Sequence, residues 1–525
     1  LVLHLGSDIG KDLGDPLLQA WQVSWIGHAL LEQPLDLWQA NTFWPNADTL
    51  AFSDALVGYA PAGLVAQESP HSALVVYNLL FVGAYGLASF GAYLLARELG
   101  LGRLGAVAAG VAFAYAPWKL SQNGHLHVLS SGGIPLALVL LLRGYRRDRS
   151  RLMLGGWLVA AWQMTLGFTL GLQFAYLLAL LGSLAVVGLA MRAIPLPDRR
   201  MLVATSVGVA VFVAASVFMA RPYLRVIDEH PEARRTPAYV ESFSPELRSF
   251  LSAPAQSWLW ADPSHRARAP LPAPDEMSLF PGLAISLLAL VGVLGSAFTR
   301  RLRSGLALGV VACALLSLGV RDASGLDRYV TPYRFLFDFA PGWDGVRTPG
   351  RINTLTSLGL ALLAGAGLCV LVRYLRARTR ARAVAAVAGV ASVGVILLEG
   401  LGPLAHPRAP VPPEAVRGAE APQLHLPAGF HDDLVYSYWS TAGYPETVNG
   451  AGGFDPDAYD RLRRDIKDFP DARSVAALRE LGVRSVLVHP ERAGETPWAG
   501  AATKPIAGLA LMRERVGGVV LFRLR

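Results

Sequence analysis

The stretch GHLHVLSSGGIPLALVLLLRGYRRDRSR, residues 124–151, decides the fold of this chain. It opens with two histidines, continues as an uncharged apolar run and closes with five arginines. An apolar run that ends in a basic cluster is typical of a helix that crosses a membrane with its basic end in the cytoplasm. The composition agrees, because 53% of the 525 residues are hydrophobic, only 16% are charged, and the mean hydropathy is +0.38. The sequence therefore predicts a mainly α, polytopic transmembrane helix bundle.

Apolar runs of this kind recur along the chain and predict about ten membrane spans, some of them shorter than the about 20 residues that a bilayer core needs. The runs are Ser72–Ala96, Leu104–Tyr115, Leu129–Leu142, Leu152–Leu166, Thr169–Met191, Met201–Ala220, Leu279–Phe298, Leu306–Val320, Leu355–Leu371 and Val384–Leu401. Alternate loops between them carry 18 arginines and only three acidic residues. These loops are residues 97–103, 143–151, 192–200, 299–303 and 373–383. The positive-inside rule places them in the cytoplasm, so the net charge of +8 is largely a topology signal and predicts no nucleic-acid partner.

The remaining loops must then face outward, in a multi-pass protein of the cell membrane. They are residues 1–71, 123–128, 221–278, 321–353 and all residues after Leu401. Because residue 1 lies outside, we expect an odd number of spans before it, most simply one. The two cysteines, Cys313 and Cys369, lie inside apolar runs and predict neither a disulfide framework nor a zinc site.

The tail predicts a second domain. Residues 1–401 form the transmembrane domain, and residues 402–525 form a proline-rich linker and a small extracytoplasmic α/β domain that we expect to fold separately. Within it, residues 433–439 are typical of a strand, 456–469 and 471–482 of helices, and 483–490 of a strand. A hairpin is expected to turn at Gly517 and Gly518. The tail is expected to bind the acceptor or to pack against the rest of the chain.

The two histidines of the opening stretch lie at the outward end of their span. His125 and His127 are too few for a metal site unless carboxylates join them from elsewhere. Three interpretations stay open: structural histidines at the interface, groups that orient a substrate or its phosphate, and ligands of a divalent metal ion. Lys119 precedes them on the same side and adds a cation.

Several segments, in this order and on the outward side, carry a resemblance to a known family. They are GDP (14–16), FWPNADTLAFSD (43–54), the span YNLLFVGAYGLASFGAYLLAREL (77–99), residues 110–147 around the histidines, and VRTPGR (346–351). Together they resemble the bacterial GT-C membrane glycosyltransferases, most closely an actinobacterial branch similar to YfhO-type proteins. The resemblance covers nearly the whole chain. It implies transfer of a hexosyl or pentosyl group from a polyprenyl-phosphate donor to a glycan, lipid or protein acceptor on the outer face of the membrane.

The resemblance also implies a catalytic acid in the first outer loop. Asp15 is the best match and Asp54 the second, with Asp8 and Asp12 as rivals. In isolation, Asp15 also fits a helix N-cap that is followed by Pro16 at the first helical position. No DxD motif and no acidic DE pair is present in the expected place, so the need for a divalent metal stays open.

The chemistry of such a transfer assigns the cations. An acceptor hydroxyl must lose its proton to a base, whereas a departing polyprenyl phosphate needs cations to stabilise its growing charge. Arg347 and Arg351 are expected to bind the donor phosphate together with Lys119, because a guanidinium can bind two oxygens at once. Both arginines equally fit snorkelling at the membrane interface.

Two other functions stay open. A transporter or lipid-handling protein of the cell envelope could have a similar bundle, although charged residues are sparse within the runs. A family member without activity is the second alternative, because the first loop, residues 1–71, carries no DE pair.

Overall fold

The computed structural model describes residues 1–67, 69–378 and 382–525, and its contacts divide the chain into two compact units. Unit 1 comprises Leu1–Leu80, Ala220–Ala233 and Ala405–Arg525, and unit 2 comprises Phe81–Met219 and Arg234–Leu404. The tail shares unit 1 with residues 1–80 and 220–233, so this unit is larger than the tail alone.

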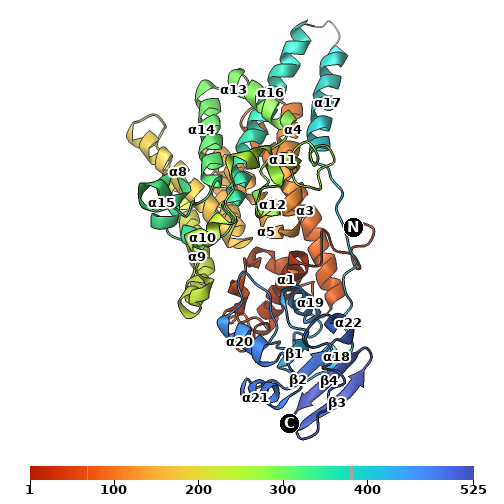
Figure 1. Ribbon diagram of the computed structural model, residues 1–525. Coiled ribbons are helices and arrows are strands. Elements are labelled where there is room, and N and C mark those ends of the chain that lie inside the picture. The colour runs from red at the N-terminus through yellow and green to blue at the C-terminus, as the bar shows by residue number, and fades with distance from the viewer. Residues whose placement is uncertain (68, 379–381) are drawn as a thin grey trace. The chain divides into compact units, whose positions relative to one another are not determined.

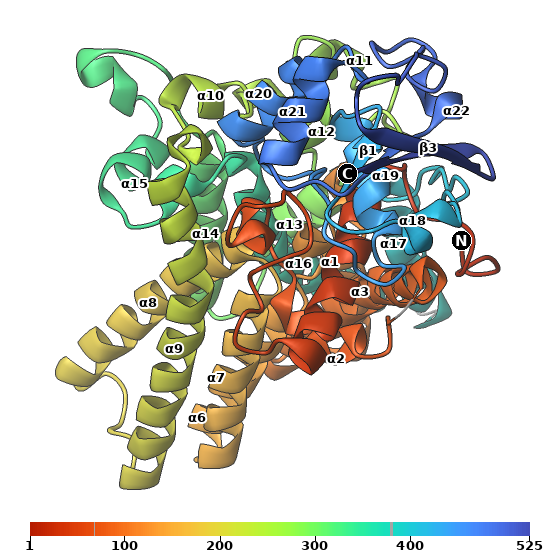
Figure 2. The ribbon, with the colours of Figure 1, turned by 90° about the horizontal axis from the view of Figure 1, so that it is seen from below.

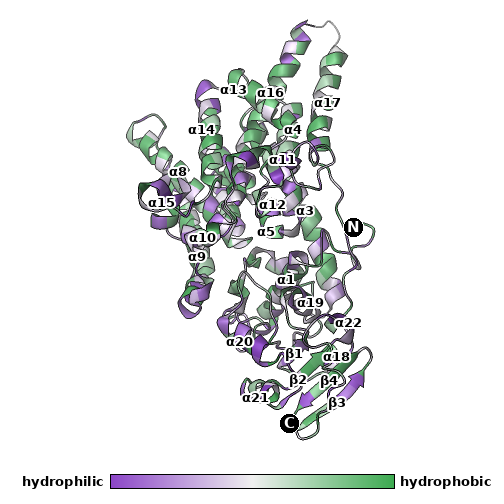
Figure 3. Ribbon diagram, viewed as in Figure 1, coloured by the Kyte–Doolittle hydropathy of each residue, from purple (hydrophilic) through white to green (hydrophobic). Residues whose placement is uncertain are grey.

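Each of the ten apolar runs overlaps a helix, which confirms the mainly α bundle (Figures 1 and 3). The helices are α3 (Pro70–Glu98), α4 (Arg103–Ala114), α6 (Gly133–Arg146), α7 (Ser150–Thr165), α8 (Phe168–Ala190), α9 (Arg199–Glu229), α13 (Leu283–Leu294), α14 (Arg300–Ser317), α16 (Asn353–Arg378) and α17 (Arg382–Glu399). Five segments of the described chain are long and apolar enough to cross a membrane: Pro70–Glu98, Leu126–Arg146, Phe168–Ala190, Arg199–Glu229 and Pro349–Arg378. The count of ten spans is therefore only partly confirmed, because α4, α13 and α17 are apolar but shorter.

Helix α16 forms the core of unit 2, where it packs against α4, α13, α14 and α17, while α6 and α7 pack side by side (Figure 2). Small residues let the backbones approach closely. A Cβ added at Gly367 of α16 would lie 1.8 Å from the carbonyl oxygen of Leu288 on α13, and one at Gly292 would lie 2.0 Å from that of Leu363. Such contacts are typical of helices that pack within a membrane.

The same helices have one arginine-rich end and one end without arginine clusters. Helix α4 begins at Arg103 and leads into the 3₁₀ helix η3 (Pro117–Gly124) and the short α5 (Leu126–Leu129), whereas α16 follows the 3₁₀ helix η8 (Pro349–Ile352) and ends at Arg378. The histidine segment and the 346–351 segment therefore lie at helix ends opposite the arginine loops. Residues 379–381 of the last arginine loop and residue 68 of the first outer loop lie outside the described residues.

Unit 1 contains the predicted α/β tail and the helix α1 (Asp15–Glu32). Its sheet has the order β1-β2-β4-β3, with β1 parallel to β2 and the other pairs antiparallel. The strands are β1 (Gln423–Leu426), β2 (Ser485–Val488), β3 (Leu511–Val516) and β4 (Val519–Leu524). The hairpin between β3 and β4 confirms the predicted turn at Gly517 and Gly518, and α20 (Asp457–Asp465) and α21 (Ala472–Glu480) confirm the two predicted helices.

The strand predicted over residues 433–439 is wrong, because these residues form the helix α19 (Phe430–Trp439). All seven residues are buried, so the run has no polar face whose period could distinguish a helix from a strand. The acidic residue Asp432 lies in the first turn, where its charge interacts favourably with the helix dipole.

The tail shares backbone hydrogen bonds with residues 41–44 of the first loop. Thr447 N donates to Asn41 O at 2.8 Å, Phe43 N donates to Asn449 O at 3.1 Å, and Trp44 N donates to Thr447 O at 3.0 Å. Buried backbone groups that lose such partners cost free energy, so the first loop stabilises the tail.

These shared hydrogen bonds replace the expectation that the tail folds separately. We expect residues 405–525, expressed alone, to lack cooperative unfolding, because the partners supplied by residues 41–44 are missing. Thermal unfolding followed by circular dichroism measures this. A synthetic peptide of residues 36–56, added in trans, is the control and should restore part of the structure. A cooperative transition of the fragment without the peptide would contradict the expectation.

Candidate functional site

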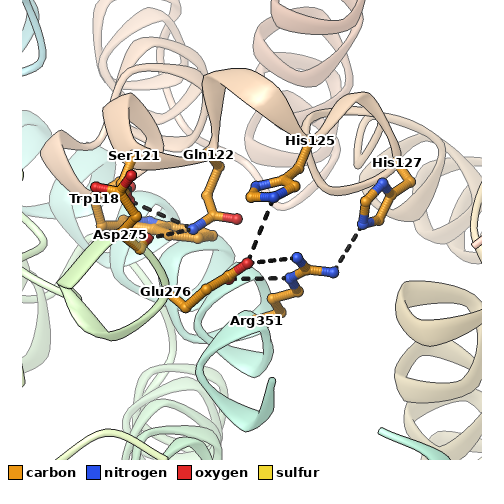
Figure 4. A network of polar contacts seen from close by, with 8 residues as sticks. All are labelled: Trp118, Ser121, Gln122, His125, His127, Asp275, Glu276 and Arg351. Atoms are coloured by element: carbon orange, nitrogen blue, oxygen red, sulfur yellow. Dashed lines mark hydrogen bonds and ion pairs between the residues drawn. The ribbon is translucent and has the colours of Figure 1, made fainter. Parts of the chain in front are cut away.

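The histidine turn of unit 2 faces a buried ion pair (Figure 4). Glu276 lies on the short helix α12 (Pro274–Met277) and Arg351 lies on η8. Arg351 Nη2 donates to Glu276 Oε1 at 2.7 Å, and Arg351 Nε donates to Glu276 Oε2 at 3.3 Å. Arg351 Nη1 lies 2.8 Å from Nε2 of His127, and His125 Nε2 lies 3.5 Å from Glu276 Oε1. Four side chains from three separate segments thus form one buried polar cluster.

The electrostatics of the cluster keep its carboxylate ionised. Burial by itself raises the pKa of Glu276, but the charges of Arg351 and His125 lower it more, so the pKa lies well below its ordinary value. A carboxylate with so low a pKa is a weak proton acceptor. Glu276 therefore suits the role of a partner that holds Arg351 in place, and it does not suit the role of a general base.

The contacts of His127 bear on the metal interpretation. Arg351 is always a donor, so the lone pair of His127 Nε2 accepts its hydrogen bond and is not directed at a metal. Among the residues that the structure describes, no group of three or more His, Cys, Asp and Glu could hold a metal ion. The contact with Arg351 favours a structural or orienting role for His127.

Arg347 differs from its neighbour Arg351. Its half-buried guanidinium lies over the ring of Phe243, 5.3 Å from the centroid, and it makes no ion pair with a carboxylate in the described part of the chain. It lies close enough to the cluster to lower the pKa of Glu276. Arg347 is therefore a cation whose charge is available to an anionic ligand.

Lys119 is a second cation without a carboxylate partner in the described residues. It is only 2% exposed, its Nζ donates to Ser131 Oγ at 3.0 Å, and it lies over the rings of Phe113 and Trp118 at 4.9 and 5.5 Å. Burial lowers the pKa of Lys119 to about 7. A bound anion would favour the charged ammonium and raise this pKa.

We expect Lys119→Met to raise the thermal stability of the detergent-solubilised protein in a pH-dependent way. The pKa falls from 10.5 to about 7 on folding, so the cost of burying the amine is full below pH 7 and vanishes as the pH rises to 10.5. The gain in unfolding temperature should be large at about pH 6 and small at about pH 10. Lys467→Met, at an exposed lysine, is the control. An equal gain at both pH values would show that Lys119 stays charged in the folded protein.

The candidate acids lie in unit 1, whereas the candidate cations lie in unit 2. Asp15 is the first residue of α1, and the capping residue is Gly14 without a side-chain bond, so the expected N-cap at Asp15 is off by one position. Asp54 lies beside the phenol of Tyr223, whose hydroxyl donates to Ser53 O at 3.0 Å and accepts from Ala55 N at 2.9 Å.

The rival acids have local partners. Asp12 accepts from Gly14 N at 2.9 Å and Asp8 accepts from the hydroxyl of Ser7 at 2.8 Å. Asp48, which the sequence did not single out, is buried and forms two hydrogen bonds with Arg225, at 2.6 and 2.8 Å. Its charge is thus matched within unit 1, which fits a structural role.

Glu399, at the end of α17, bears on the transporter alternative. Its carboxylate accepts from Leu283 N and Ala284 N, at 3.0 and 2.9 Å, and from Trp260 Nε1 at 3.2 Å. These contacts cap the first turn of α13 and interact favourably with its dipole. This buried acid has a structural explanation and gives no support to an ion pathway.

Comparisons with known proteins define the fold. No protein-family model and no curated protein matches the sequence. The arabinofuranosyltransferase AftD from Mycobacteria superposes on 98% of this chain with a TM-score of 0.57 and 16% identity. The oligosaccharyltransferase of Archaeoglobus fulgidus in its apo form superposes on 94% of this chain and 67% of its own, with a TM-score of 0.50 and 14% identity. The match covers only 38% of the AftD chain, so this chain spans little more than a third of that enzyme.

Proposed function

We propose that this chain, which has the fold of the GT-C membrane glycosyltransferases, is itself a glycosyltransferase. It transfers a sugar from a polyprenyl-phosphate-linked donor to an acceptor hydroxyl on the outer face of the membrane. The sugar is a hexose or a pentose, and the acceptor is a glycan, a lipid or a protein. We also propose that the chain belongs to the YfhO-like branch of these proteins. The tail is proposed to lie outside the membrane with the acceptor.

The reaction needs one base and a set of cations. The acceptor oxygen attacks the anomeric carbon, the bond from that carbon to the phosphate oxygen breaks, and its electron pair remains on the departing phosphate. The acceptor proton passes to a carboxylate, for which we propose Asp15, with Asp54 as the second candidate. The departing phosphate is already a good leaving group once cations stabilise its charge.

The observation that carries the proposal is an available cation, Arg347, near the matched buried ion pair of unit 2, with Lys119 as a second available cation of the same unit. Arg347 and Lys119 have no carboxylate partner in the described residues, so each can donate a hydrogen bond to a phosphate oxygen. The charge of Arg351 is matched by Glu276, and His127 accepts one of its N–H groups. We therefore assign direct phosphate binding to Arg347 and Lys119. We propose that Arg351 supports the phosphate site without contacting the phosphate, and that His125 and His127 orient the ion pair of Arg351 and Glu276.

We expect Arg347→Ala to weaken both donor binding and turnover, because one well-placed donor to a developing anion contributes about 2.7–4 kcal/mol. Arg347→Lys should recover part of the loss, since an ammonium keeps the charge but lacks the planar fork. Binding of a polyprenyl-phosphate sugar to the purified protein measures the first effect. Arg321→Ala, at another arginine of the outer segments of unit 2, is the control. Unchanged donor binding by Arg347→Ala would remove Arg347 from the phosphate site.

A further inference from the structure

A pocket of unit 1 is not used by the chemistry assigned above. It has a volume of about 360 Å³ and lies between the second half of α1, residues 33–47 and residues 444–446 of the tail. Pockets that bind small molecules usually measure about 300–1,000 Å³. This one is therefore large enough for a small ligand or for one end of a longer one.

Aromatic rings form one wall of the pocket. The rings of His28 and Tyr444 are stacked, with centroids 3.9 Å apart and planes inclined by 16°, and Trp25 meets Tyr444 edge-on at 5.9 Å. Trp44 also lines the pocket. A sugar ring has a face of C–H groups that packs on an aromatic face, while its hydroxyls point outward to polar neighbours.

Polar groups of the required kind surround these rings. Glu446 is exposed, and its carboxylate makes no hydrogen bond or ion pair in the described part of the chain, so it can accept hydroxyl donors. Burial lowers the pKa of His28, against a smaller opposing effect of Glu32, so the neutral ring offers one donor and one acceptor. Asn41 is already fixed by Trp21 and Pro445 and gives the pocket a rigid wall.

The charges of the lining exclude a phosphate. None of the residues that line the pocket is a lysine or an arginine, and Glu446 would repel an anion. The lining thus suits an uncharged saccharide and does not suit the phosphate end of the sugar donor.

The backbone at Tyr444 holds its ring in place at a conformational cost. Its φ is +53°, a left-handed value that is a genuine outlier for a bulky residue, and it follows Gly443 with a φ of +104°. The hydroxyl of Tyr444 lies 2.7 Å from Ser24 Oγ and 3.2 Å from Gln67 Oε1, which anchors the far end of the ring. Strained residues that are held this firmly cluster at active sites, ligand-binding positions and switch regions.

We propose that this pocket binds the acceptor, as a neutral oligosaccharide, at a subsite several sugar rings from the hydroxyl that reacts. The proposal rests on the proposed function, in which Asp15 is the base. His28 follows Asp15 by 13 residues on the same helix, which corresponds to roughly 20 Å along its axis. A ring bound against His28 and Tyr444 is therefore not the reacting ring, and the acceptor must be a chain long enough to reach both places.

The proposal is tested by measuring whether the purified full chain, in detergent, binds to an immobilised array of neutral and acidic oligosaccharides. We expect neutral chains to be retained, and His28→Ala and Tyr444→Ala to weaken retention about tenfold each. Phe430→Ala removes an exposed ring elsewhere in unit 1 and is the matched control. Because Tyr444 also anchors the backbone, Glu446→Gln at an exposed side chain provides a second variant and should weaken retention severalfold. No retention, retention of acidic chains alone, or equal retention by all variants overturns the proposal.

Sugar-transfer assays separate this proposal from the proposed function. Short acceptors that cannot reach the pocket should be used equally well by wild type and Glu446→Gln, whereas long acceptors should show a raised KM in the variant and an unchanged kcat. Equal KM values of wild type and Glu446→Gln for long acceptors would refute the acceptor subsite but not the proposed transferase activity. Binding of neutral chains that depends on Tyr444, without any transfer from a polyprenyl-phosphate donor, would refute the transferase and leave a carbohydrate site.

Discussion

Asp15→Asn is expected to lower sugar transfer by about 10²–10⁴, which is the usual contribution of a general base. Asparagine keeps the shape of the side chain at the start of α1 but cannot take the acceptor proton. Donor binding, which we assign to Arg347 and Lys119 in unit 2, should be unchanged. Initial rates with a labelled polyprenyl-phosphate sugar, and separate measurements of donor binding, distinguish the two effects.

The matched control is Asp36→Asn, an exposed acid later in the same N-terminal segment, which should leave transfer near the wild-type rate. Near-normal transfer by Asp15→Asn would eliminate Asp15 as the base, and Asp54→Asn would then be the next variant. Loss of transfer in both Asp15→Asn and Asp54→Asn, with donor binding intact, would indicate that the two acids share the work.

Glu276→Gln is expected to destabilise unit 2 by about 3–5 kcal/mol, because it leaves the guanidinium of Arg351 buried without a countercharge. Arg351→Met should be similarly harmful near neutral pH. Without Arg351, burial would raise the pKa of Glu276, so its protonation should relieve the loss as the pH falls. Thermal unfolding in detergent, at several pH values, measures these changes.

The double variant Glu276→Gln with Arg351→Met is the control for this pair. Replacing both members of a buried ion pair is often nearly neutral, so its loss should be much smaller than the sum of the two single losses. Additive losses would show that the two residues contribute independently to the free energy of unfolding. The short contacts between them would then contribute no interaction energy.

The sequence predicts the helices and the hairpin because those features are local. The apolar run of residues 72–96 has the length of α3, and the pair Gly517-Gly518 between two apolar runs is the usual signal of a tight hairpin. The helix α19 was missed for the opposite reason, since a run that is buried on every side has no polar face to reveal its period.

Only part of the candidate site could be predicted from the sequence. His125, His127, Arg347, Arg351 and Lys119 stood out because charged and imidazole side chains are scarce near apolar runs. Glu276 did not, because it lies in a long irregular segment and its partner Arg351 is 75 residues away. The sequence did offer one signal for Glu276. It is a carboxylate between proline-rich residues and the next apolar run, and it is predicted to lie on the same side of the membrane as the two arginines.

The pocket at Tyr444 could not be predicted at all. It is formed by α1, residues 33–47 and the tail, which meet only in the folded unit 1. The left-handed backbone at Tyr444 also has no sequence signal apart from the preceding glycine.

The proposed activity is best tested by measuring transfer of a labelled sugar from a polyprenyl-phosphate donor to a glycan acceptor, with the purified chain in proteoliposomes. We expect labelled glycan and free polyprenyl phosphate to appear together in the wild type, and both to fall to the background of empty vesicles in Asp15→Asn and to fall strongly in Arg347→Ala. Binding of the same donor with no release of polyprenyl phosphate, from either hexosyl or pentosyl donors, would contradict it and would favour a lipid-handling protein with this fold.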